Sequence, residues 1–211
     1  MAVARRRGRG LGSPARLLAA FDRFDEEAAD RVIEESLAVR SLERTIEELL
    51  LPALELAARR ENHAAELEHA CRWATGWLHA ARRLTPTATR PEGVLLLDSG
   101  SPFGLEALCV QALELFLRRA GLRVLLLSAT LREPRFATAL RALRPHAVVL
   151  CGSQASLSVV GTALRRALAD GSSVRVFGYR AAQLVSGQRG VPLLGSSPGD
   201  ATAALLEALS A

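Results

Sequence analysis

The stretch VLLLDSGSPFG, residues 94–104, decides how the second half of this chain folds. Residues 94–97 form a continuous apolar run, which is typical of a parallel strand covered on both faces. Asp98, Ser99 and Gly100 end that run, and Ser101 with Pro102 is the pattern of a helix cap followed by a first-turn proline. Ligands of open α/β sheets bind at such strand-to-helix loops. We therefore expect this loop to lie at a binding site.

Beyond this loop, short apolar runs alternate with amphipathic segments. The alternation predicts that residues 93–211 form a doubly wound, flavodoxin/Rossmann-like α/β domain with a five-stranded parallel sheet in the order 2-1-3-4-5. The strands are expected at residues 94–97, 122–127, 147–151, 174–177 and 191–194. The helices are expected at residues 102–120, 133–143, 156–169 and 200–209, with a short one near 181–185.

The residues before the loop follow a helical period. Residues 13–84 are predicted to form four amphipathic helices that pack as an antiparallel four-helix bundle, because their connections are short. Phe24 and Leu37 are expected on apolar helix faces, and Pro52 is expected to kink the third helix. Residues 85–92 form a Pro/Thr-rich linker, and residues 1–12 form a disordered Arg-rich arm.

Composition excludes several classes of protein. The formal charge is +5 and the sequence pI is 10.3, but all 27 basic residues are arginine, so this value partly reflects the base composition of the source. The sequence contains no helix-turn-helix pattern, so sequence-specific DNA binding is not expected. No apolar run reaches the roughly 18–20 residues of a membrane span. Cys71, Cys109 and Cys151 form no CxxC pair, which favours a reducing cytoplasm over secretion and argues against structural zinc.

The fourth predicted helix carries one aromatic line. His69, Trp73 and Trp77 follow one another at intervals of four residues, so they share a helix face, with Glu68 and Arg72 beside them. One interpretation is that the indoles pack against the neighbouring domain. The other is that this face forms a wall for a flat conjugated ligand.

A helical bundle, a short linker and a flavodoxin-like domain, in this order, resemble the cobalamin-binding module. More narrowly, residues 13–211 are similar to the light-sensing module of MerR-type cobalamin-dependent photoreceptors and to the helper module of methionine synthase. The local matches are LLLPALELA at residues 49–57, the Glu68-His69 pair and RPHAVVL at residues 144–150. In the photoreceptors a Glu-His pair faces the upper side of the corrin, which the resemblance implies for Glu68 and His69.

The cobalamin motifs of that family are degenerate here. Its first loop reads Asp-x-His-x-x-Gly, and alignment on Gly104 places Ser99 and Ser101 at the aspartate and at the cobalt-ligating histidine. Serine is a poor cobalt ligand compared with imidazole. Cys151 to Ser153 replace the family's Ser-x-Leu, and Gly178-Tyr179 replace its Gly-Gly. We therefore expect the scaffold without the histidine-ligated, base-off cobalamin site.

The resemblance then implies a non-enzymatic sensor that binds a tetrapyrrole between the bundle and the sheet domain and acts in light sensing and signalling. A linear bilin such as biliverdin is favoured over cobalamin, because a bilin needs aromatic walls and partners for its nitrogens and propionates but no metal ligand. Arg72, Arg132 and Arg180 are candidate propionate partners. The predicted cofactor-binding residues are Glu68, His69, Arg72, Trp73, Trp77, Asp98, Ser99, Ser101, Phe103, Gly104, Cys151, Ser153, Gly178 and Tyr179.

Other interpretations stay open. A heme held by His69, His79 or Cys71 is one of them. Another is a ligand-free domain for protein interaction or transcription regulation. A protein partner for signal output and a homo-oligomer also remain open. An enzyme is not expected, because no phosphate-binding glycine pattern is present and neither Asp98 nor Cys151 has a base nearby in sequence.

Overall fold

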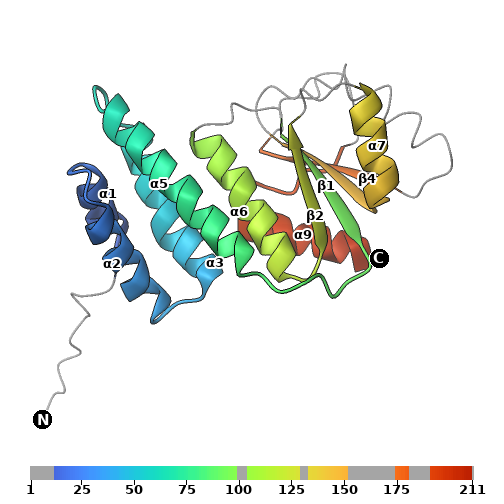
Figure 1. Cartoon of the computed structure of the whole chain (residues 1–211), viewed down its shortest axis with the longest axis horizontal. Coiled ribbons are helices and arrows are strands. Elements are labelled where there is room, and N and C mark those ends of the chain that lie inside the picture. The colour runs from blue at the N-terminus through green and yellow to red at the C-terminus, as the bar shows by residue number, and fades with distance from the viewer. Residues whose placement is uncertain (1–11, 99–103, 129–132, 152–173, 181–190, 211) are drawn as a thin grey trace, which may run out of the picture. The chain divides into compact units, whose positions relative to one another are not determined.

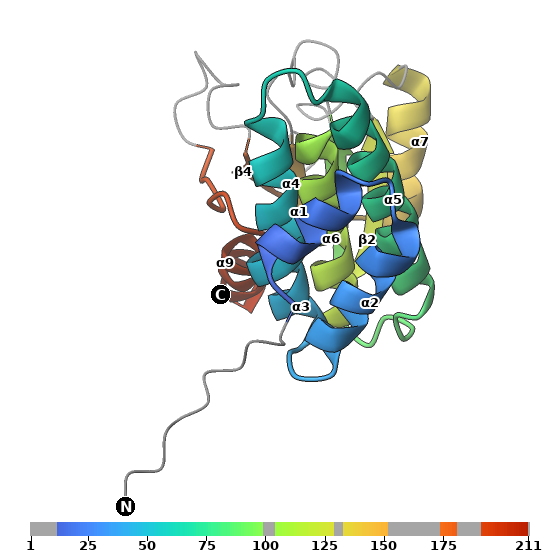
Figure 2. The ribbon, with the colours of Figure 1, turned by 90° about the vertical axis from the view of Figure 1, so that its left-hand side faces the viewer.

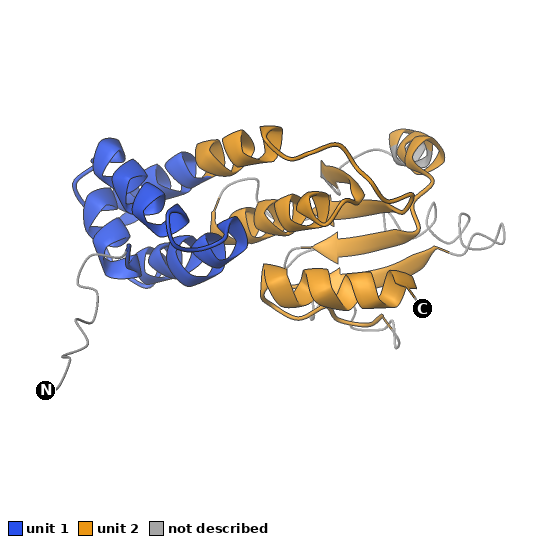
Figure 3. Ribbon diagram, turned by 90° about the horizontal axis from the view of Figure 1, so that it is seen from below, with its two compact units in different colours: residues 1–74 blue, residues 75–211 orange. Residues whose placement is uncertain are grey.

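The computed structural model describes residues 12–98, 104–128, 133–151, 174–180 and 191–210 (Figure 1). The chain divides into two compact units, Met1–Ala74 and Thr75–Ala211, which we call the helical unit and the sheet unit (Figure 3). The division falls inside α5 (Ala64–Arg83), so this helix contributes residues to both units. The predicted boundaries of the bundle and linker stay predictions.

The helical unit contains α1 (Pro14–Phe21), α2 (Glu26–Leu37), α3 (Leu42–Thr45), a π-helical turn η1 (Ile46–Leu50), α4 (Leu51–Ala58) and the first half of α5. Side-chain oxygens of Ser13, Asp25 and Ser41 accept hydrogen bonds from the first turns of α1, α2 and α3, which fixes where these helices begin. Helix α1 packs on α2 and α4 (Figure 2). Their apolar faces meet in a core that includes Leu17, Phe21, Ile33, Ile46, Leu49, Leu50 and Leu54.

The third helical segment departs from α-helical bonding just before Pro52, where we expected a kink. Proline removes a backbone N–H and crowds the carbonyl four residues earlier, here that of Glu48. The wider turn of η1, Ile46–Leu50, lies at this place.

Two side chains that were predicted to be apolar-face residues are exposed. Phe24 is 52% exposed, because α1 ends at Phe21 and Phe24 itself has a left-handed φ of 55°, so the helical spacing no longer applies to it. Leu37 is 39% exposed at the last position of α2. For these two residues the predicted burial is wrong.

The described sheet has four parallel strands in the order β2-β1-β3-β4, which are β1 (Gly93–Asp98), β2 (Arg123–Ser128), β3 (Ala147–Cys151) and β4 (Arg175–Tyr179). This order matches the first four positions of the predicted one. The predicted fifth strand is reduced to one parallel bridge between Leu193 and Gly178. Pro192 lacks a donor, and Gly195 turns to a φ of 91°, so the extended run is too short for a strand.

Helices cover both faces of the sheet (Figures 1 and 3). Helix α7 (Glu133–Leu143) covers the face formed by Leu95, Leu97, Val148 and Leu150. Helix α6 (Leu105–Arg119) packs against β1 and β2, and α9 (Pro198–Ser210) packs along α6. Both faces are therefore buried, as the apolar run of β1 predicted.

Helix α6 begins later than the sequence pattern suggested. Its N-cap is Gly104, whose φ of 116° disfavours any side chain, and its first residue is Leu105. The prediction that the helix begins at residue 102 is wrong. The predicted helices at residues 156–169 and 181–185 lie outside the described residues.

Candidate functional site

The aromatic line of α5 meets α1 within the helical unit. The ring centroid of Trp73 lies 5.4 Å from that of Phe21 in an edge-to-face arrangement. The imidazole of His69 lies 6.4 Å from Phe21 and 5.1 Å from Phe24. Trp73 and His69 are both half-buried. Phe21, Phe24, His69 and Trp73 thus form one group, which we call the α5 aromatic cluster, and part of its surface reaches solvent.

His69 has an unusual environment inside this cluster. Its Nε2 atom is buried and has no hydrogen-bond partner among the residues that the structure describes. Burying a polar nitrogen without a partner costs about 1–3 kcal/mol. A bound ligand that hydrogen-bonds to this nitrogen would remove that cost.

Other predicted residues of α5 are arranged differently. Glu68 and Arg72 pair with each other at 2.6 Å, and their side chains are 69% and 77% exposed. A pair this exposed contributes at most about 1 kcal/mol and lies in solvent rather than in a pocket. Trp77 is half-buried one turn beyond Trp73, in the part of α5 that belongs to the sheet unit.

The alternative heme ligands differ in accessibility. His79 is exposed, whereas Cys71 is buried and burial raises the pKa of its thiol. Among the described residues, no group of three or more His, Cys, Asp and Glu side chains forms a metal site. Of these candidate ligands on α5, His69 is the one with a buried nitrogen that lacks a hydrogen-bond partner among the described residues.

The carboxyl edge of the sheet brings the predicted strand-end residues together. In register, Asp98 pairs with Cys151, and Cys151 pairs with Tyr179, so these three residues lie side by side on β1, β3 and β4. Cys151 is fully buried, and its Sγ lies 3.7 Å from the carbonyl of Val149. Burial raises the pKa of the Cys151 thiol well above its usual value, and the Asp98 carboxylate adds to this effect.

Tyr179 is buried at the end of β4, and Leu193 lies against Gly178. The Tyr179 side chain is 0% exposed, and its hydroxyl lies 3.3 Å from the carbonyl of Ser196 and 3.5 Å from that of Cys109. A side chain at Gly178 would meet Leu193 at 2.9 Å, so this glycine makes room for Leu193. In the cobalamin-binding family, the resemblance implies two glycines here, beside the nucleotide tail. In this chain the second of these positions holds the buried side chain of Tyr179.

Several predicted site residues are not described. Ser99, Ser101, Phe103 and Ser153 lie outside the described residues, as does the candidate propionate partner Arg132. Gly104 is described and acts as the N-cap of α6. Arg180 is described with a left-handed φ of 51°, and its Nη1 donates to the carbonyl of Ser196 at 3.1 Å.

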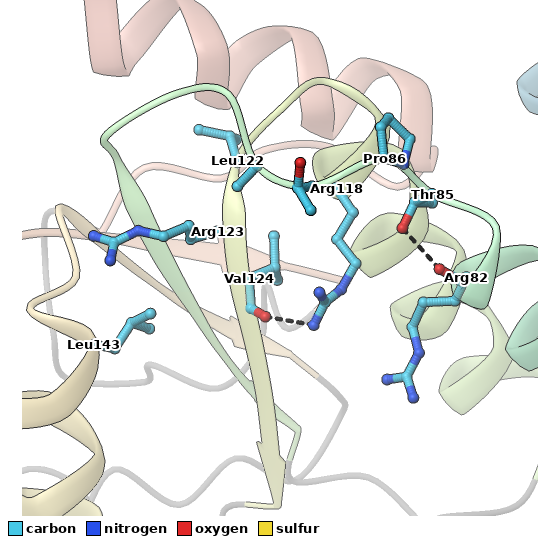
Figure 4. A pocket seen from close by; sticks show the side chains of 10 residues that line it. Arg82, Thr85, Pro86, Arg118, Leu122, Arg123, Val124 and Leu143 are labelled. Carbon is cyan, nitrogen blue, oxygen red and sulfur yellow. Dashed lines mark hydrogen bonds between the residues drawn. The ribbon is translucent and has the colours of Figure 1, made fainter.

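The structure also reveals a charged group that the sequence interpretation missed. Glu114 of α6 is buried and accepts from Arg82 at 3.1 Å and from Arg118 at 2.9 Å. Both arginines line a cavity of about 380 Å³ in the sheet unit (Figure 4). The signal available in sequence was one glutamate inside the otherwise apolar run ALELFL at residues 112–117.

Comparison with solved structures identifies the fold. The monomethylamine corrinoid protein of Methanosarcina barkeri matches with a TM-score of 0.66 and 12% identity over 91% of this chain and 96% of that chain. A cobalamin-binding protein from Desulfitobacterium hafniense matches with a TM-score of 0.43 and 15% identity, covering 92% of this chain and 98% of that one. The first of these likenesses shows that the chain has the fold of a corrinoid protein.

The sequence comparisons are negative: no protein-family model matches this chain, and no curated protein matches it.

Among the described residues, no helix combines the length and the apolar character needed to cross a membrane.

Proposed function

We propose that this chain is a non-enzymatic sensor module that binds a tetrapyrrole without a nucleotide tail on the α5 aromatic cluster. The observation that carries the proposal is the buried Nε2 of His69, which lacks a partner among the described residues and lies in a group of aromatic rings. Aromatic rings provide flat apolar contact, and a single polar atom orients the ligand. The corrinoid-protein fold supports the choice of ligand class, since a corrin is itself a tetrapyrrole ring.

The buried Tyr179 at the end of β4 supports a tail-less ligand. Tyr179 stands where the family resemblance implies the second glycine beside the nucleotide tail, and its side chain is fully buried there. The residues present therefore do not fit cobalamin in the base-off mode that the family resemblance implies. A linear bilin such as biliverdin needs no lower metal ligand and no tail pocket, so we favour it and, with it, a role in light sensing.

The test uses the full chain titrated in the dark with biliverdin, followed by absorbance spectra before and after red illumination. We expect saturable binding with a sharpened red band that changes on illumination. His69→Phe keeps a ring but removes the nitrogen, and it should raise the Kd about tenfold, which corresponds to one hydrogen bond of about 1.4 kcal/mol. The matched control is His79→Phe on the same helix, where the histidine is exposed and the Kd should stay unchanged.

Other outcomes would redirect the proposal. Hemin binding with a Soret band that His69→Phe abolishes would assign the cluster to heme. A chain that remains spectrally silent with both pigments would favour the second candidate, a ligand-free regulatory domain. Two observations favour the ligand-free domain. Trp73 packs edge-on against Phe21, and Tyr179 is buried at the end of β4.

A further inference from the structure

The cavity in the sheet unit has the lining of an anion site. Its wall contains three arginines and no acidic residue, with the remaining surface supplied by the linker and by apolar side chains. The lining residues are Arg82, Thr85, Pro86, Thr87, Ala88, Arg118, Leu122, Arg123, Val124 and Leu143. We propose that this cavity binds a small molecule that carries a phosphate or carboxylate group, independently of the tetrapyrrole proposed above.

Charge balance is the first argument. Glu114, buried behind the wall, is shared by two guanidinium groups, since Arg118 Nε donates to its Oε1 at 2.9 Å and Arg82 Nη1 donates at 3.1 Å. One carboxylate thus faces two positive charges, and Arg123 adds a third. An anionic group in the cavity would offset the charge that Glu114 leaves unbalanced.

Donor geometry is the second argument. A guanidinium carries five N–H donors in a planar fork, and the described bonds use only some of them. Arg118 Nη2 donates to the carbonyl of Val124 at 2.5 Å, which holds the Arg118 side chain against the start of β2. Among the described residues, no hydrogen bond engages Nη1 of Arg118, Nη2 of Arg82 or Nη1 of Arg123. Arginines held in place in this way recognise phosphate and carboxylate well.

The shape of the cavity indicates more than a bare ion. A volume of about 380 Å³ lies within the range of small-molecule pockets. Figure 4 shows Arg82 and Arg118 extending alongside each other, while Leu122, Val124 and Leu143 supply apolar wall. A dianionic group on a partly apolar body fits this combination.

The cavity does not lie at the carboxyl edge of the sheet, where ligands of open α/β sheets bind. Arg123 is the first residue of β2, whereas Asp98, Cys151 and Tyr179 end their strands. Six residues of parallel strand span about 17 Å, so the cavity lies at the opposite, amino-terminal edge of the sheet. A ligand there would join the last turn of α5 and residues 85–88 to β2.

The proposal is tested by calorimetric titration of the full chain with three probes at constant ionic strength. These are pyrophosphate, adenosine monophosphate and citrate, which separate bare phosphate, phosphate on an apolar body and carboxylate. We expect at least one probe to bind saturably with one site per chain. Arg82→Gln and Arg123→Gln should each raise its Kd at least fivefold, and both leave the Glu114–Arg118 pair intact.

Two further variants make the result decisive. Arg141→Gln removes an exposed arginine of α7 that lies outside the cavity lining, and it should change the Kd less than twofold. Ala88→Phe adds bulk at the wall without changing charge and should abolish binding. The proposal is overturned if no probe binds, if Arg141→Gln weakens binding as much as Arg82→Gln, or if Ala88→Phe leaves the Kd unchanged.

Discussion

At the scale of single residues, Tyr179 determines what the end of β4 can accommodate. Its ring is fully buried, and its hydroxyl lies within reach of two backbone carbonyls that belong to other parts of the sheet unit. A buried tyrosine hydroxyl with partners is stabilising, whereas the same ring without them would leave polar groups unsatisfied. The residue therefore belongs to the core and leaves no room for a ligand at this position.

Truncation of Tyr179 tests this role. Tyr179→Phe keeps the ring and should lower the free energy of unfolding by about 1 kcal/mol through the lost hydroxyl contact. Tyr179→Ala should lower it by about 3–5 kcal/mol, as expected for a buried aromatic ring. Urea unfolding followed by circular dichroism measures both. A loss below 1 kcal/mol for Tyr179→Ala would show that the ring is not part of the core.

The buried thiols predict a pH dependence of stability. Burial raises the pKa values of Cys71 and Cys151, so the folded chain holds these protons more tightly than the unfolded chain, whose thiols ionise near pH 8.5. The stabilisation is therefore complete below about pH 8.5 and is lost as the pH rises above it, by about 1 kcal/mol per pH unit for each thiol.

Unfolding free energies measured at pH 7.5, 8.5 and 9.5 check this expectation. Cys151→Ala should flatten the decline between pH 8.5 and 9.5. An equally steep decline in this variant would mean that Cys151 does not titrate differently in the folded and unfolded chain.

At the scale of elements, the linkage of α5, α6 and β2 depends on one buried carboxylate. Glu114 accepts from Arg82 in the last turn of α5 and from Arg118 in the last turn of α6, and Arg118 also binds the backbone of β2. Because both arginines reach solvent in part, they can be hydrated when the carboxylate is removed. The cost of removing it should therefore stay below that of a fully buried pair.

Glu114→Gln tests the linkage. The variant should lower the free energy of unfolding by about 2–3 kcal/mol, the value for hydrogen bonds to charged groups. Glu207→Gln on the exposed face of α9 is the matched control and should change it by less than about 0.5 kcal/mol. Equal effects of the two substitutions would contradict a special role for Glu114.

Elements were predictable where local sequence alone determines them. The apolar runs predicted β1 to β4 close to their observed positions. The start of α6 was not predictable from Ser101 and Pro102, because the backbone at Gly104 has a positive φ and the helix begins after it. The short bridge at Leu193 likewise depends on packing against Gly178 rather than on the apolar run around it.

At the scale of the whole molecule, the strand order and the parallel arrangement followed from the alternation of strands and helices. The arginine cavity did not, since its wall combines residues that are up to 61 positions apart, from Arg82 to Leu143. At this scale the fold also does not determine which ligand is bound. The chain has a corrinoid-protein fold, yet Tyr179 is buried at the end of β4, so the fold alone does not identify the ligand.

We propose that this scaffold accepts a tail-less tetrapyrrole and rejects cobalamin in its base-off form. The most direct measurement is an absorbance titration of the wild-type chain with hydroxocobalamin beside one with biliverdin, in the dark and at equal concentrations. We expect a saturable red-band change with biliverdin and an unchanged cobalamin spectrum. A saturable shift of hydroxocobalamin to its base-off spectrum, with no response to biliverdin, would contradict it.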